Sequence, residues 1–139
     1  MASAETQASK GKQRPLSPHL QIYSPLINMV MSIVHRITGA ALYFGTALLA
    51  WWLIAAAMGP AYFGFVNGLL GSPIGLVVLA GYSWALLHHM IGGIRHLIWD
   101  TGRGFDLGTV NSLSWGTIIL SLALTAALWL YALRAKGMI

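Results

Sequence analysis

Three long stretches of this chain contain no charged residue. The first runs from Ile37 past Met58, the second from about Pro73 to Ile94, and the third from about Asn111 to Leu133. Each is long enough, at about 20 residues, for a helix to cross a hydrocarbon core about 30 Å thick. Only 8% of the residues are charged, against about 25% in soluble domains. The sequence therefore predicts an all-α integral membrane protein, a bundle of three transmembrane helices.

The segments outside these helices are interpreted from their composition. Pro25 suits the start of a helix, so the first helix is expected to begin near Leu26. Residues 1–25 are polar and lack the apolar core of a signal peptide, so they are interpreted as a retained N-terminal arm. Residues 26–139 then form the transmembrane domain, in which 59–72 are expected to be a connection between helices.

The positive residues predict the topology of the chain. The net charge is +5, but the Lys and Arg residues lie at segment ends rather than on one patch, which argues against nucleic-acid binding. The N-terminal arm and the connection after the second helix carry positive charge, and the 59–72 connection carries none. The positive-inside rule places the N-terminus in the cytoplasm, although Arg134 and Lys136 oppose this weakly. The short arm beginning with Met favours a bacterial inner membrane over a mitochondrial one.

The second predicted helix carries an ionisable cluster, which in hydrocarbon is a functional-site candidate and here suggests a bound haem. His89 lies ten residues before Trp99, or about 15 Å along the helix, and so well within the bilayer. His88 points about 100° away from it, so the two cannot bind the same iron, and a structural role suits His88 better. Arg95 and His96 lie nearer the surface, where they could contact haem propionates or a partner subunit.

The first predicted helix carries a second cluster, at its inner end. Ser32 and Arg36 are four residues apart and share a face, and His35 lies beside them. A guanidinium at the hydrocarbon boundary can pair with a haem propionate or donate to a quinone. An arginine there can also simply anchor the helix to phospholipid.

The chain has no cysteine, so it cannot hold haem through a thiolate or an iron–sulfur cluster through cysteines. Low-spin haem needs two axial ligands, one on each face of the ring. The deeper histidines are His89 and His35. Because His35 is expected to lie too near the boundary to match His89 in depth, the second ligand is expected from another polypeptide. The alternative, a self-contained cytochrome with both histidines on the iron, stays open here.

Two motifs resemble those of the cytochrome b556 subunits of succinate dehydrogenase, the first membrane anchor of respiratory complex II. The first is Arg14-Pro15-Leu16-Ser17-Pro18-His19-Leu20 followed by Ser32-x-x-His35-Arg36-x-Thr38-Gly39. The second is His89-x-x-x-Gly93-Ile94-Arg95-His96, ending in Trp99-Asp100. With the three-helix layout, the resemblance covers nearly the whole chain, and no matching position departs from the pattern.

The resemblance implies that His89 is an axial ligand of haem b, with a histidine of a second anchor subunit on the other side. It implies that Ser32 and Arg36 belong to a ubiquinone pocket, and that His35 and Arg36 lie close to the haem propionates. FAD and the iron–sulfur clusters then belong to partner subunits, a flavoprotein and an iron–sulfur protein. A cofactor-free structural anchor of another respiratory complex is the remaining alternative.

Overall fold

The computed structural model describes residues 22–138, so most of the N-terminal arm, including the motif from Arg14 to Leu20, lies outside the described residues. Four helices make up this part of the chain: α1 (Ile27–Met58), α2 (Pro60–Leu70), α3 (Pro73–Asp100) and α4 (Leu107–Ala135). Of these, α1, α3 and α4 are long and apolar enough to cross a membrane. The prediction of an all-α fold with three spanning helices is confirmed.

The helix starts follow from local chemistry. The first helical residue of α3 is Pro73, and the hydroxyl of Ser72 caps the helix by accepting a hydrogen bond from the backbone nitrogen of Gly75 at 3.1 Å. The carboxylate of Asp106 caps α4 in the same way, through the backbone nitrogen of Thr109 at 2.8 Å. Because of this cap, α4 begins at Leu107, four residues before the start expected from hydrophobicity.

The segment expected to be only a connection contains a helix of its own, α2. It begins directly after Gly59, whose φ of 113° lets the chain turn sharply out of α1. Two side-chain bonds hold it against α1: the indole nitrogen of Trp51 donates to the hydroxyl of Tyr62 at 3.0 Å, and that of Trp52 donates to the amide oxygen of Asn67 at 2.9 Å. With 11 residues, α2 is too short to span a bilayer.

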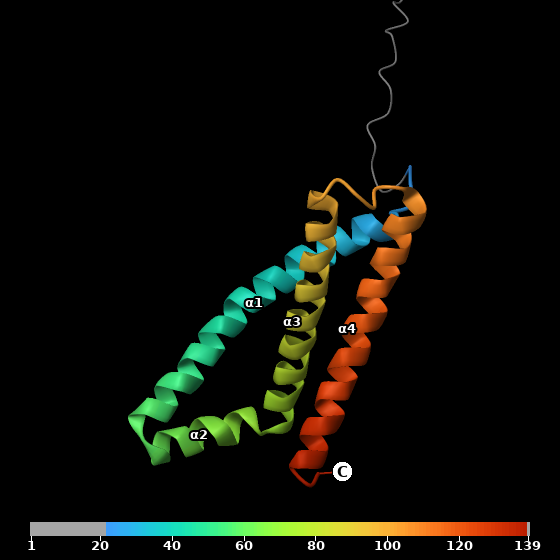
Figure 1. Cartoon of the computed structure of the whole chain (residues 1–139). Coiled ribbons are helices and arrows are strands. Elements are labelled where there is room, and N and C mark those ends of the chain that lie inside the picture. The colour runs from blue at the N-terminus through green and yellow to red at the C-terminus, as the bar shows by residue number, and fades with distance from the viewer. Residues whose placement is uncertain (1–21, 139) are drawn as a thin grey trace, which may run out of the picture.

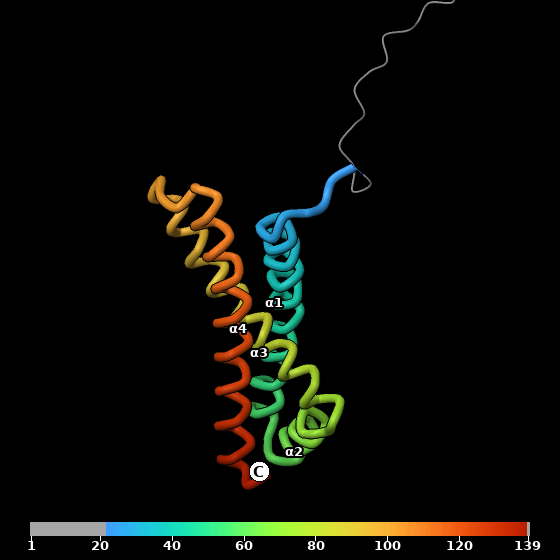
Figure 2. Tube along the Cα trace, turned by 90° about the vertical axis from the view of Figure 1, so that its right-hand side faces the viewer, coloured from blue at the N-terminus to red at the C-terminus, as the bar shows by residue number. Residues whose placement is uncertain are grey.

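The three long helices are not parallel to one another. Figure 1 shows α1 crossing α3 near the upper end of the molecule and diverging from it below, where α2 bridges the gap. Figure 2, turned by 90°, shows α2 at the same lower end as the C-terminus. The start of α1, the end of α3 and the start of α4 therefore share one end of the molecule. The oblique crossing places residues of the first turns of α1 against the last turns of α3.

A polar seam joins α3 and α4. Ser114, Thr117 and Ser121 of α4 are buried, and two of them bond to α3. A guanidinium nitrogen of Arg95 donates to the hydroxyl of Ser114 at 3.2 Å, and Nδ1 of His88 lies 3.2 Å from the hydroxyl of Ser121. Since lipid provides no hydrophobic force between helices, such bonds and close packing must hold them together.

The corner between α2 and α3 depends on Gly75, and its replacement gives a first prediction. An added Cβ would collide with the carbonyl oxygens of Leu69 and Leu70, which as backbone atoms cannot move cheaply. Gly75→Ala is therefore expected to destabilise the protein by about 1–3 kcal/mol and to lower the thermal midpoint of the purified protein. Gly68→Ala on α2 is the control, because nothing lies within 4 Å of its added Cβ. Equal midpoints for the two variants would contradict this packing.

Candidate haem and quinone site

Two histidines meet where α1 crosses α3. The rings of His35 and His89 are stacked, with centroids 3.9 Å apart and planes within 5° of parallel. The ring of His96 lies 5.1 Å from that of His35. The expectation that His35 lies too near the boundary to match His89 in depth is therefore wrong. Because α1 runs obliquely (Figure 1), position along its sequence does not report depth along α3.

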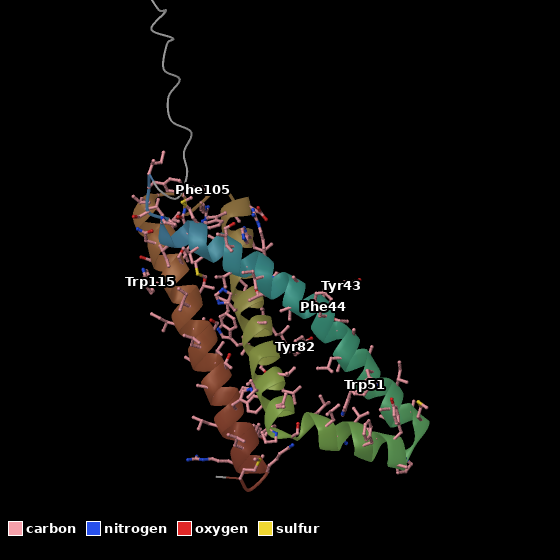
Figure 3. All side chains as sticks on the ribbon, turned by 180° about the vertical axis from the view of Figure 1, so that it is seen from behind. Tyr43, Phe44, Trp51, Tyr82, Phe105 and Trp115 are labelled. Carbon is pink, nitrogen blue, oxygen red and sulfur yellow. The ribbon has the colours of Figure 1, made fainter. Side chains whose placement is uncertain are left out.

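Glycines on the opposite helices make this contact possible. A Cβ added at Gly92 of α3 would lie 2.6 Å from Nδ1 of His35, and one added at Gly39 of α1 would lie 3.0 Å from Cε1 of His89. Each histidine thus lies over a bare stretch of the other helix. Farther along the same crossing, Gly45 leaves room for the ring of Tyr82, which Figure 3 shows between α3 and α1.

The hydrogen bonds of His89 determine which of its nitrogens can bind a ligand. Its Nδ1 lies 3.1 Å from the main-chain carbonyl oxygen of His35 and 3.4 Å from the hydroxyl oxygen of Thr38. A carbonyl can only accept, so Nδ1 carries the proton and Nε2 presents its lone pair. Metal-binding histidines ordinarily have this arrangement, in which the second nitrogen donates to a carbonyl or carboxylate.

The surroundings of His89 also fit a haem. Nothing lies within 4 Å of a Cβ added at Gly93, one helical turn from His89, so the surface of α3 is open at that position. Within residues 22–138, no group of three or more His, Asp or Glu side chains converges as a site for a free metal ion. A porphyrin supplies four of its iron's ligands itself, so a single suitably oriented imidazole is what this chain needs to contribute.

The stacked geometry argues against the alternative of a self-contained cytochrome. Two histidines that bind one iron lie on opposite faces of the macrocycle, with the iron between their nitrogens. Parallel rings with centroids 3.9 Å apart have no space between them for a porphyrin. In this arrangement His35 and His89 cannot both bind the same iron.

The predicted quinone residues lie beside this crossing, on α1. Ser32 is half-buried and Arg36 is exposed on the helix surface. An exposed guanidinium at this position faces outward from the three-helix bundle. It is therefore accessible to a quinone, a haem propionate or a partner subunit. His96 is also exposed. Which of these groups contacts a ligand stays a prediction.

Arg95 lies elsewhere, in the α3–α4 interface. Its side chain is only 3% exposed, and its guanidinium lies 5.0 Å from the centre of the Trp99 ring, in addition to its bond to Ser114. The guanidinium thus faces α4 rather than the His35–His89 stack. His88, also buried, faces α4 through Ser121, as its 100° offset from His89 predicts.

Sequence reasoning missed the partners of these two residues. The α4 hydroxyls that bond to Arg95 and His88 are those of Ser114 and Ser121, and with the buried Thr117 they recur at spacings of three and four residues. That periodicity places them on one helix face and is a usable signal for a polar interhelical seam.

Comparison with known proteins agrees with the resemblance. The family described as succinate dehydrogenase/fumarate reductase transmembrane subunit matches residues 10–128. The succinate dehydrogenase cytochrome b556 subunit of Rickettsia felis is 42% identical over 117 residues, 84% of this chain and 91% of the relative. That of Paracoccus denitrificans is 40% identical over 111 residues, 80% and 85% of the two chains. The mitochondrial cytochrome b560 subunit of Homo sapiens is 36% identical over 129 residues, 88% and 73% of the two chains. With three helices able to span a bilayer and relatives of this kind, the chain is a multi-pass membrane protein that belongs to the succinate dehydrogenase/fumarate reductase transmembrane subunit family.

Proposed function

We propose that this chain is the cytochrome b anchor subunit of a succinate:ubiquinone oxidoreductase and that His89 is an axial ligand of its haem b. The observation that carries the proposal is the bond from Nδ1 of His89 to the carbonyl oxygen of His35, 3.1 Å away. This bond fixes the tautomer that leaves Nε2 available to iron and orients the ring. When bound, haem supplies one-electron redox chemistry.

The second axial ligand comes from another polypeptide, a second hydrophobic anchor subunit. The stacking of His35 on His89 supports this division, since two rings stacked in this way do not face one iron from opposite sides. His35, Arg36 and His96 are proposed to contact the haem periphery: the His35 ring stacks on His89, and the His96 ring lies 5.1 Å from that of His35. Contact of Arg95 with the haem periphery stays a prediction, because its guanidinium bonds to Ser114 of α4.

We also propose that Ser32 and Arg36 form this chain's share of a ubiquinone site. Reduction places negative charge and then protons on the two quinone oxygens. A hydroxyl donor and a fixed cation can stabilise that charge where it develops. Exposure of Arg36 on the outer surface of α1 supports a ligand held between this chain and a partner. The electrons arrive through the FAD and iron–sulfur clusters of the flavoprotein and iron–sulfur subunits.

The proposed topology rests on the positive residues of the N-terminal arm and of the connection after α3, and the domain bounds rest on composition. The N-terminus and the Ser32–Arg36 end of α1 lie on the cytoplasmic side of a bacterial inner membrane, facing the soluble subunits. Residues 1–25 form the arm and residues 26–139 the haem and quinone anchor domain, in contact with membrane lipid.

The test of this function is the haem spectrum of the assembled complex, in the native form and with His35→Ala. The native complex is expected to contain low-spin haem b. His35→Ala should keep it, with a perturbed spectrum, because alanine preserves the main-chain carbonyl to which His89 donates and removes only the stacked ring.

Two outcomes would contradict the proposal. Loss of all low-spin haem in an assembled His35→Ala complex would favour the self-contained cytochrome. Absence of haem from the native complex, measured as pyridine haemochrome, would favour a cofactor-free structural anchor.

A further inference from the structure

We propose that Thr38 is a positioning residue, whose hydroxyl oxygen acts as a second acceptor for the Nδ1 proton of His89 and so tunes the electron donation of this ligand to the haem iron. The inference rests on the proposed role of His89. Thr38 lies on α1, its side chain is 1% exposed, and its Oγ1 is 3.4 Å from Nδ1 of His89.

The direction of each hydrogen bond follows from counting donors and acceptors. Oγ1 of Thr38 lies 3.0 Å from the carbonyl oxygen of Val34 and 2.9 Å from that of His35. The His35 carbonyl already accepts the Nδ1 proton of His89 and the helical amide proton of Gly39, which occupy its two lone pairs. The hydroxyl has one proton for these two carbonyls, and donating it to Val34 avoids a third proton on the His35 carbonyl. This leaves a lone pair of Oγ1 facing Nδ1 of His89.

Two acceptors on one imidazole proton increase the basicity of the opposite nitrogen. A more basic ligand stabilises the more highly charged ferric state of a bound iron, which lowers the reduction potential. The longer Thr38 contact is the weaker of the two, at 3.4 Å against 3.1 Å to the His35 carbonyl. Thr38 is therefore expected to adjust the reduction potential of the haem and not to be required for haem binding. Burial of Thr38 keeps water from replacing the hydroxyl.

A threonine in a membrane helix often bonds to the carbonyl four residues before it for purely local reasons. The chain supplies a matched control for that role. Thr46 lies on the same helix and its hydroxyl bonds to the carbonyl of Leu42 at 2.9 Å, but it is exposed and far along α1 from His89. If the hydroxyl of Thr38 had only this local role within α1, replacing Thr38 or Thr46 should have the same effect on the haem.

The experiment uses the assembled complex with Thr38→Val, Thr38→Ser and Thr46→Val. The reduction potential of the haem is measured by a redox titration followed by absorbance, and its g-values by electron paramagnetic resonance. Thr38→Val is expected to keep the haem, to shift the potential in the positive direction and to change the g-values. Thr38→Ser, which keeps the hydroxyl, and Thr46→Val should match the native complex. Thr38→Ala replaces Thr38→Val if the latter does not assemble.

Unchanged potential and g-values in the haem-loaded Thr38→Val or Thr38→Ala complex would overturn the inference, as would an equal shift in Thr46→Val. Neither result affects the assignment of His89. Retention of native low-spin haem after removal of the His89 side chain would instead overturn the proposed function itself, so the two failures are distinguishable.

Discussion

His89→Ala is expected to abolish the low-spin haem signal of the assembled complex. The substitution removes Nε2 of His89, the proposed iron-binding nitrogen, whose lone pair is available because Nδ1 of the same ring donates to the His35 carbonyl. The neighbouring imidazole cannot substitute, since His35 lies over Gly92 in a stack with parallel planes. The measurement is the reduced-minus-oxidised absorbance spectrum with haem quantified per complex.

The matched control for this prediction is His88→Gln. His88 is the adjacent residue and is buried, but its ring bonds to Ser121 of α4 and faces away from α1. Its replacement should leave the haem spectrum intact. In a parallel His89→Gly complex, added imidazole is expected to enter the space left by the ring and to restore low-spin haem. A native spectrum in His89→Ala would refute the ligand assignment.

Arg36→Ala is expected to slow ubiquinone reduction by about 30-fold while leaving succinate oxidation by an artificial electron acceptor almost unchanged. A hydrogen bond to a charged group contributes about 2 kcal/mol, and about 1.4 kcal/mol corresponds to a tenfold rate change. The exposed guanidinium is not needed for packing of the described helices. Comparing the two assays on the same preparation separates a local quinone role from a general loss of assembly.

Arg103→Ala serves as the control for Arg36, because Arg103 is also an exposed arginine at the same end of the molecule. It should behave as the native complex in both assays. A parallel decrease in the two activities of Arg36→Ala would be inconsistent with a quinone contact and would indicate that the arginine anchors the subunit.

Much of the architecture was predictable because lipid imposes a simple requirement. In hydrocarbon every backbone polar group must be satisfied internally, so an uncharged stretch of sufficient length becomes a helix. This sufficed for α1, α3 and α4. It did not suffice for α2, since residues 60–70 are apolar but too few to span a bilayer, and the bonds from Trp51 and Trp52 that hold α2 against α1 join residues far apart in the sequence.

The site was predictable in part. The motifs identified His35 and His89 as a pair of interest, and helical geometry correctly separated His88 from His89. The expected depth of His35 was wrong, because it was inferred from the distance along α1 as if that helix ran parallel to α3. Arg95 illustrates the same limit: its sequence position suggests a surface cation, and only the packing of α4 places it beside Ser114.

The sequence by itself determined that this chain has three helices able to span a membrane, and it proposed which side chains hold a cofactor, because hydrophobicity and helical periodicity are local properties. The tertiary structure decided which of those side chains meet. The oblique crossing of α1 over α3 and the glycines at positions 39 and 92 bring the two imidazoles together. Their contact depends on interhelical angle and close approach, which no single helix encodes.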